Sequence, residues 1–208
     1  MKERCKALKL FIKKAMLNNT SIANEGLLAY IGLTYQLQKG KIVFTSVDIL
    51  CSILQGSKET FVENRALYNK VKTGIENLQE IGVIKKLYDI KKYGYALDCS
   101  DLILDTERES FIILESELLN KIISTPAISV DKAIRFLCVL VASINTDTGV
   151  GFTSIEKLAE RSSISKKQAI ALVKRLEENK SLYVHRSDEP ARLANGRFLN
   201  RPNQYILL

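Results

Sequence analysis

The stretch FTSIEKLAERSSISKKQAIALVKRLEENKSLYV, residues 152–184, decides the fold of this chain. A hydroxyl residue followed by charged residues predicts a first helix that begins at Thr153 or Ser154. The serines between Arg161 and Ser165 favour turns and caps over a continued helix, because their hydroxyls compete for backbone hydrogen bonds. We therefore predict a helix, a tight turn and a second helix that Ser165 caps.

The second helix is amphipathic, with apolar side chains at helical spacing on one face. Its opposite face is polar and basic around the small Ala171, and the candidate DNA-binding residues there are Ser165, Lys166, Lys167, Gln168, Lys174 and Arg175. Lysine donates to guanine or phosphate, glutamine pairs with adenine, and a small side chain permits close approach to the bases. This pattern predicts a recognition helix for the major groove, and a solvated helix face is the alternative.

Composition favours an anionic partner. The chain has 208 residues, a formal net charge of +8 and an isoelectric point near 9.3. A basic surface also serves solubility or an anionic membrane, so charge alone does not choose the partner. No apolar run has the length of a membrane span and no secretion signal opens the chain, so we expect a cytoplasmic protein without a membrane partner.

Catalytic and metal motifs are missing from the sequence. There is no GxxxxGKS or GxxxxGKT phosphate loop, His185 is the only histidine, and the four cysteines form no CxxC pair. We expect Cys51 and Cys138, which lie in apolar stretches, to be reduced core residues. The sequence therefore predicts no enzyme, no catalytic or metal-ligating residues and no cofactor.

The motif occurs twice. FTSVDIL at residues 44–50 is close to FTSIEKL at residues 152–158, and a Phe-Ile pair and a serine-led helix precede each copy. We interpret this as a tandem duplication of one unit that runs strand, helix, helix, helix and wing. The predicted fold is mainly α with small β wings, an α+β protein of two tandem winged helix-turn-helix domains, at residues 1–105 and 106–208.

The first copy departs from the second between its second and third helices. About ten more residues lie there, roughly Gly56 to Asn64, and they predict a longer loop or an added helical turn. The third helix, near residues 65–80, presents candidate DNA contacts at Tyr68, Asn69, Lys70 and Lys72. Gly74 in the middle of this helix costs about 1 kcal/mol relative to alanine, which indicates close packing or close approach to a partner.

Further basic residues lie outside the helices. The first wing turns at Lys91 and Lys92, and the second wing carries Arg186, Arg192, Arg197 and Arg201. Side chains of this kind reach phosphates or a narrow minor groove, whereas solvated loops are the alternative. Residues 2–17 mix basic with apolar side chains, and we predict a basic N-terminal arm or short helix with a strand around Leu10 to Ile12.

These motifs, closing on NRPNQYILL at residues 200–208, resemble the winged-helix domains of plasmid and phage replication initiators of low-GC Gram-positive bacteria, including DnaD-like N-terminal domains. The resemblance covers most of the second half and the first half loosely. It implies binding of double-stranded DNA at an origin or operator, with Lys166, Lys167 and Gln168 at the recognition-helix positions. Replication proteins and a second copy of the chain, as a homodimer, are the other partners to consider.

Alternative functions share this fold. A transcription regulator or a plasmid-partition protein uses the same DNA-binding elements, and a tandem winged-helix module can instead grip a partner protein without binding DNA. Such interaction modules tend to be acidic, whereas both halves of this chain are positive, at +5 and +3. We therefore expect a sequence-specific DNA-binding protein, with a replication initiator or origin-binding protein favoured.

Overall fold

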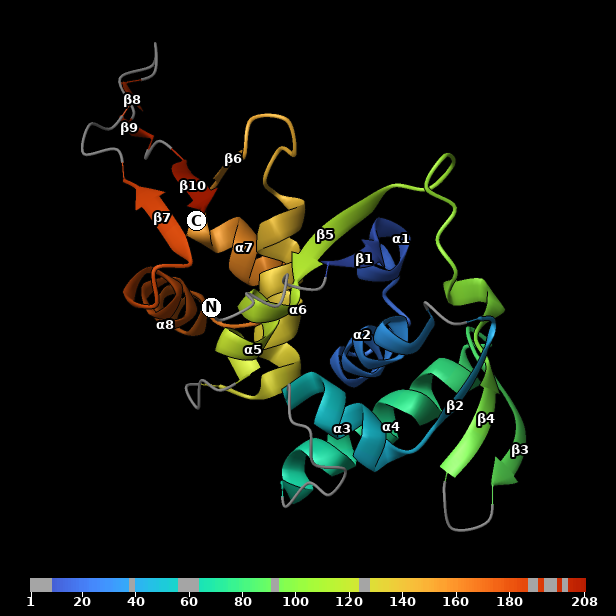
Figure 1. Ribbon diagram of the computed structural model, residues 1–208. Coiled ribbons are helices and arrows are strands. Elements are labelled where there is room, and N and C mark those ends of the chain that lie inside the picture. The colour runs from blue at the N-terminus through green and yellow to red at the C-terminus, as the bar shows by residue number, and fades with distance from the viewer. Residues whose placement is uncertain are drawn as a thin grey trace, which may run out of the picture. The chain divides into compact units, whose positions relative to one another are not determined.

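The computed structural model combines helices with small antiparallel sheets, so the fold is mixed α+β (Figure 1). It describes residues 9–37, 40–55, 64–90, 94–123, 128–186, 191–192, 198–199 and 202–208. Among the helices in these ranges, none is both long and apolar enough to cross a bilayer.

The chain divides into two compact units after Arg135, inside helix α6 (Val130–Ala142). The sequence placed this division after Asp105. Strand β5 (Phe111–Glu115), which follows Asp105, pairs antiparallel with strand β1 (Lys9–Lys13). This pairing brings residues from beyond the predicted boundary into the first unit.

The first unit is built on helices α2 and α4 and a three-stranded sheet of order β2-β4-β3. After β1 its elements are α1 (Lys14–Asn18), α2 (Asn24–Leu37), β2 (Ile42–Thr45), α3 (Val47–Gln55), α4 (Arg65–Glu80), β3 (Lys85–Ile90), β4 (Gly94–Asp98), a 3-10 turn (Ser100–Leu102), β5 and α5 (Ser116–Ile123). Buried aliphatic side chains from all three long helices fill its core, since Leu27, Leu50 and Leu78 are fully buried.

Two glycines let α2 and α4 pack closely. A Cβ atom at Gly74 would lie 2.0 Å from the Glu25 carbonyl oxygen and 2.9 Å from the Ala29 Cβ atom. A Cβ atom at Gly26 would lie 2.3 Å from Oδ1 of Asn77. Of the two explanations that the sequence allowed for Gly74, close packing is therefore confirmed.

The second unit consists of the rest of α6, a sheet of order β6-β10-β7 and two helices against it. Its elements are β6 (Val150–Thr153), α7 (Ile155–Arg161), α8 (Lys166–Glu178), β7 (Leu182–His185), β8 (Ala191–Arg192), β9 (Phe198–Leu199) and β10 (Asn203–Leu207). The core side chains include Leu158, Leu172, Leu176 and Tyr205, each at most 1% exposed. The sequence predicts strands at residues 182–186 and 203–207 for the second wing, and both are present as β7 and β10.

The element order from β1 to β4 recurs from β5 to β10, with β8 and β9 added. Ser46 and Ser154 each accept a hydrogen bond from the backbone N–H three residues later, at 3.2 Å in both cases. Gly82 and Lys180 follow the last helix of each copy, and both have a left-handed φ, 76° and 53°. The sequence repeat therefore has a counterpart in backbone conformation.

Several elements differ from the prediction. The strand expected around Leu10 is present as β1 and is followed by the short helix α1, whereas helix α5 and the four-residue strands β2 and β6 were not predicted. The predicted insertion falls mostly on residues 56–63, which lie outside the described residues. Helix α4 begins after it, with Oδ1 of Asn64 accepting the Leu67 backbone N–H at 3.1 Å. Cys51 and Cys138 are both buried, as expected.

Candidate nucleic-acid interface

The turn between α7 and α8 has the local geometry that the serine pattern predicted. Ser154 caps α7, and the buried Ser162 donates its hydroxyl hydrogen bond to the Leu158 carbonyl oxygen at 2.7 Å. Ser163 adopts a left-handed φ of 54°, which reverses the chain. Ser165 then begins α8 with a capping box, so the two helices are held by a short and well-bonded turn.

Gln168 takes part in this capping box. Its Oε1 atom accepts the Ser165 backbone N–H at 3.0 Å, and Ser165 Oγ accepts the Gln168 backbone N–H at 3.2 Å. The side-chain carbonyl that would pair with adenine is thus already bonded within the helix end. Ser165 and Gln168, both predicted to contact DNA, act here in fixing the first turn of α8.

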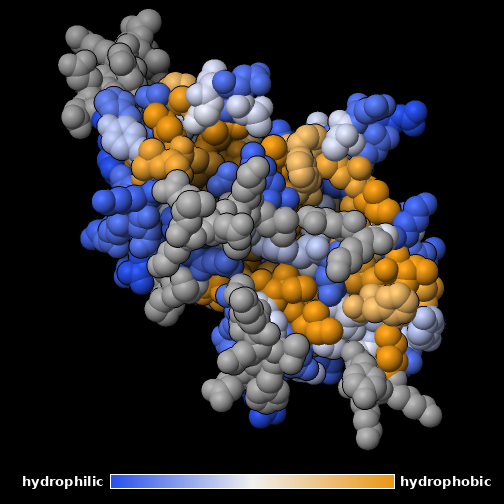
Figure 2. All heavy atoms as spheres, in the orientation of Figure 1, coloured by the Kyte–Doolittle hydropathy of each residue, from blue (hydrophilic) through white to orange (hydrophobic). Residues whose placement is uncertain are grey.

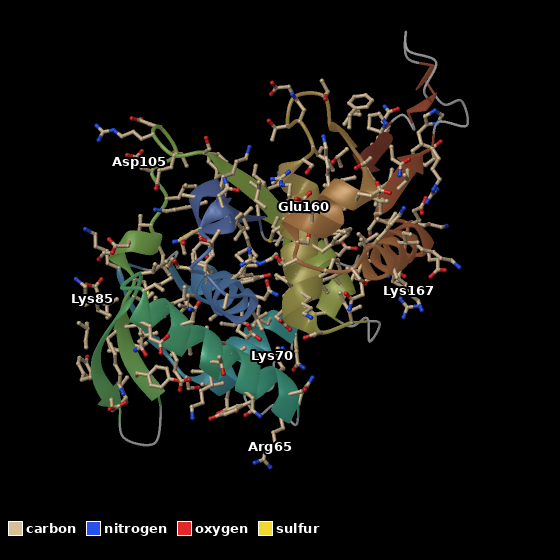
Figure 3. All side chains as sticks on the ribbon, turned by 180° about the vertical axis from the view of Figure 1, so that it is seen from behind. Arg65, Lys70, Lys85, Asp105, Glu160 and Lys167 are labelled. Carbon is tan, nitrogen blue, oxygen red and sulfur yellow. The ribbon has the colours of Figure 1, made fainter. Side chains whose placement is uncertain are left out.

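One stripe of α8 is exposed along two turns. Lys167, Ile170, Ala171 and Lys174 share this stripe because they are three or four residues apart. Figure 3 shows Lys167 projecting from α8, and no described residue forms an ion pair with it. Ile170 is 49% exposed, although it was not among the predicted DNA contacts. Its i+3 spacing from Lys167 was the signal that could have identified it, and an exposed aliphatic group there suits a thymine methyl.

Every predicted cation of α8 except Lys167 lies near an acidic side chain. Lys166 Nζ lies 2.6 Å from Glu156 Oε1 on α7, and its hydrogen bond is the main reason that the Glu156 pKa is lowered. Lys174 and Arg175 lie 4.0 Å and 3.9 Å from the Glu178 carboxylate. These exposed pairs are weak, so each cation remains able to exchange its carboxylate for a phosphate.

Arg186 has a structural partner instead of a free guanidinium. Its Nη1 atom donates to Glu177 Oε1 at 2.9 Å and its Nη2 atom to Oε2 at 2.5 Å, which raises the Arg186 pKa. This fork ties the end of β7 to α8. Of the other wing arginines, Arg192 lies in strand β8, whereas Arg197 and Arg201 lie outside the described residues.

Two of the three cations on helix α4 of the first unit, Lys70 and Lys72, lie beside carboxylates. Asn69 and Lys72 are exposed and Tyr68 is half-buried. Lys72 lies 4.0 Å from Glu76 on the same helix, beside a small cavity of about 210 Å³ that Lys86 and Tyr95 also line. Lys91 and Lys92, predicted to reach phosphates from the wing tip, lie outside the described residues.

Lys70 is held by carboxylates from two other helices. Its Nζ atom lies 2.7 Å from Asp131 Oδ1 and 3.4 Å from Glu25 Oε1, and Asp131 is only 2% exposed. Burial tends to raise the Asp131 pKa, but hydrogen bonds from Lys70 and Ser129 outweigh burial, so the pKa is lowered. The predicted role of Lys70 in DNA contact thus competes with a structural role.

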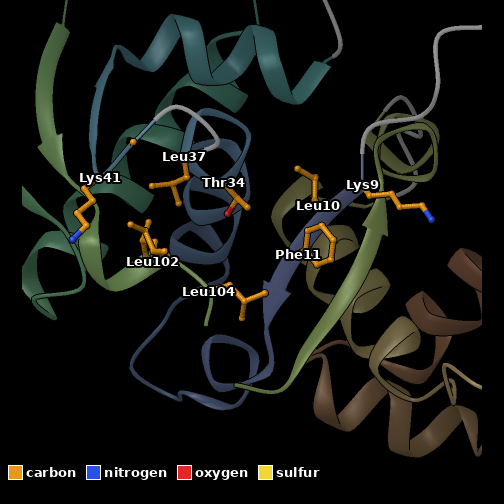
Figure 4. A pocket seen from close by; sticks show the side chains of 10 residues that line it. Lys9, Leu10, Phe11, Thr34, Leu37, Lys41, Leu102 and Leu104 are labelled. Atoms are coloured by element: carbon orange, nitrogen blue, oxygen red, sulfur yellow. The ribbon is translucent and has the colours of Figure 1, made fainter. Parts of the chain in front are cut away.

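An apolar pocket of about 250 Å³ lies beside β1 in the first unit (Figure 4). Leu10, Phe11, Leu37 and Leu102 are among its lining residues. Lys9, Thr34 and Lys41 are the polar residues of its lining, and the Thr34 hydroxyl already donates to the Tyr30 carbonyl oxygen at 2.8 Å. The lining offers packing for an apolar group and no pair of groups arranged for acid, base or nucleophilic chemistry.

Within the described parts of the chain, no three His, Cys, Asp or Glu side chains gather closely enough to hold a metal ion. Comparison of the chain with protein-family models, curated proteins and solved structures finds no match to any of them. The geometry of α7, α8 and the two sheets therefore carries the functional argument.

Proposed function

We propose that the chain is a double-stranded DNA-binding protein of two tandem winged-helix units, with α8 as its principal recognition helix. The supporting observation is the exposed stripe of α8, in which Lys167 and Lys174 flank Ile170 and the small Ala171. A helix with this face can approach base edges closely while its lysines meet phosphates. The capping box at Ser165 fixes the helix end that enters the groove first.

The repeated sheet topology supports the winged-helix assignment. In both units the last strand, β4 or β10, is the central strand of the sheet. On one side it pairs with the strand that precedes the two helices, β2 or β6. On the other side it pairs with the strand that follows them, β3 or β7. The hairpin then lies beside the end of the third helix, where a wing reaches the DNA backbone. We assign the principal DNA contact to the second unit, because Lys70 on α4 is held by the buried Asp131, whereas Lys167 on α8 forms no ion pair with a described residue.

The biological role that we propose is that of a plasmid or phage replication initiator or origin-binding protein without enzymatic activity. This role rests on the resemblance of the two motifs to winged-helix initiators. A transcription regulator or partition protein would use the same helix, so the binding experiment below tests duplex binding, which all three roles require. The DNA sequence that the chain binds would then distinguish the three roles.

The test is equilibrium binding of fluorescently labelled duplex DNA at several salt concentrations. We expect affinity to fall steeply with salt, because each phosphate contact releases a counterion. Lys167→Ala should weaken binding to all sequences and reduce the salt slope by about one unit. Lys121→Ala is the matched control, because it removes the same charge from a lysine that pairs with Glu117 on α5 at 3.1 Å.

Two results would contradict the proposal. One is the absence of salt-dependent duplex binding at low ionic strength. The other is an equal loss of affinity in the Lys167 and Lys121 variants, which would trace binding to net charge instead of the α8 face.

A further inference from the structure

The solvent face of the β2-β4-β3 sheet carries exposed aromatic side chains. Phe44 on β2 and Tyr88 on β3 both lie opposite Ala96 on the central strand, so the three residues form one row on the same face. Phe44 is 57% and Tyr88 54% exposed, whereas Ala96 is fully buried. The two rings therefore border the small central residue and keep much of their surface open to solvent.

Neighbouring side chains extend this row into a patch, which we call the β2-β4-β3 platform. Ile42 on β2 is 50% exposed, and Leu87, at a register shift in β3, is 47% exposed. In Figure 2 apolar residues gather over the region where Figure 1 places β2 and β4. At about 100 Å² per half-exposed large side chain, the platform offers on the order of 400 Å². A patch of this size on a single chain is often a binding surface.

The edge of the platform is positively charged. Lys85 on β3 lies opposite Asp98, in the row of residues adjacent to the Phe44 row, and projects from the hairpin (Figure 3). Lys41 directly precedes Ile42. The Asp98 carboxylate already accepts hydrogen bonds from the hydroxyl and backbone N–H of Ser100, at 2.6 Å and 3.0 Å. The charges of the two lysines exceed that of the single carboxylate, which is already hydrogen-bonded to Ser100. The edge therefore carries a net positive charge, which complements phosphate.

We propose that the platform binds single-stranded nucleic acid by stacking unpaired bases on Phe44 and Tyr88. Strands in a sheet are about 4.8 Å apart, so the two residues lie about 10 Å from each other across Ala96, and each can take its own base. Exposed aromatic rings on a sheet with basic neighbours are the arrangement by which proteins hold single strands with little sequence preference.

A duplex and a second copy of the chain fit the platform less well. A duplex keeps its base faces stacked inside and offers mainly phosphates and groove edges, for which two phenyl rings are poor partners. A stable dimer buries about 800 Å² on each partner, roughly twice what the platform offers. The inference is separate from the proposed duplex site, because Phe44 and Tyr88 lie in the first unit and the exposed stripe of α8 in the second.

The second unit provides a matched comparison. Phe152 on β6 occupies the position of Phe44 in the repeated motif and is 66% exposed. Its row contains Gln204 and His185 instead of Ala96 and Tyr88. We assign the stacking to the first unit, since only its row places two exposed benzene rings around a small central residue.

The test uses the full chain and a labelled single-stranded oligothymidine. Phe44→Ala and Tyr88→Ala should each weaken single-strand binding by roughly 5- to 150-fold, the range for loss of one stacked base, and leave duplex binding unchanged. Phe44→Leu keeps the apolar volume but removes the π face, so it should lose about as much affinity as Phe44→Ala, whereas Phe44→Tyr should retain it. Because Phe44 and Tyr88 are exposed, the thermal midpoint should change little.

A spectroscopic readout reports stacking directly. The chain contains no tryptophan, so Phe44→Trp introduces a single indole fluorophore on the platform and Phe152→Trp introduces one on the other sheet. Stacked bases should quench the indole at position 44 on titration with oligothymidine, and quench the indole at position 152 less.

Three outcomes would overturn the inference. The first is single-strand binding that Phe44→Leu retains in full, since contact would then be apolar and not stacked. The second is absence of single-strand binding in a wild-type chain that still binds duplex, which would leave the proposed function intact. The third is a wild-type dimer in sedimentation that Phe44→Ala converts to a monomer without change in single-strand affinity, which would make the platform a self-association surface.

Discussion

Replacing Gly74 by alanine tests how the two main helices of the first unit are packed. Gly74 lies inside α4, and alanine is favoured there over glycine by about 0.5–1 kcal/mol if only helix propensity matters. The packing predicts the opposite sign. The added Cβ atom would lie 2.0 Å from the Glu25 carbonyl oxygen, 2.6 Å from its carbonyl carbon and 2.9 Å from the Ala29 Cβ atom.

The magnitude follows from which atoms must move. Two of the three neighbours belong to the α2 backbone, so no side-chain rotation relieves the contact, and the helices must separate by more than 1 Å. Overpacking of this kind costs about 1–3 kcal/mol and sometimes more. After the gain in propensity, we expect a net loss of about 1–2 kcal/mol, which corresponds to a fall of roughly 2–8 °C in the thermal midpoint of a chain of this length.

Thermal unfolding followed by circular dichroism measures this effect. Thr73→Ala is the matched control, because Thr73 is the exposed neighbour on the same helix and its replacement changes propensity without a clash. We expect the Thr73 variant to keep or slightly raise the midpoint. An unchanged or raised midpoint in the Gly74 variant would refute the close approach of α2 and α4.

Three further predictions concern the second unit and the ion pair around Lys70. Ala171→Glu should abolish duplex binding without loss of stability, measured by fluorescence anisotropy and thermal unfolding, because the side chain is exposed on the α8 stripe. Lys180→Gly should raise the free energy of unfolding by up to about 1 kcal/mol in urea denaturation, since a left-handed φ of 53° strains lysine more than glycine. The Asp131 pKa is lowered from its ordinary 3.8, so its contribution to stability is present above about pH 4 and is lost as the pH falls through the lowered value. Lys70→Met should remove that contribution and shift acid unfolding to higher pH, whereas an unchanged acid transition would argue against the pair.

Much of the local structure could be predicted from the sequence. Ser154 and Ser165 cap helices where the hydroxyl pattern placed caps, and β7 and β10 lie where the sequence predicted the strands of the second wing. The repeat of FTSVDIL and FTSIEKL corresponds to a repeated order of helices and strands. These features depend on interactions between residues a few positions apart, so the sequence contains their cause.

The partners of long polar side chains could not be predicted in this way. The sequence predicted Lys70 and Arg186 to be exposed cations available to DNA. In the structure Lys70 pairs with Asp131, 61 positions later, and Arg186 forms a two-bond pair with Glu177. The sequence around Gln168 fits two roles for its side chain, a base contact from a recognition helix and the last position of a capping box. The nearer hydrogen bond, to Ser165, is the one that forms, and it occupies the carbonyl oxygen that adenine would need.

The sequence by itself determined the basic character of the chain, the helix-turn-helix with its serine caps and the internal repeat, because composition and local hydrogen bonding decide these. Only the tertiary structure decided that β1 pairs with β5, that α2 meets α4 at Gly74 and that Phe44 and Tyr88 share one open face. Each of these depends on strand register or helix approach between segments far apart in the chain. Such contacts follow from how the units pack, and no local pattern specifies them.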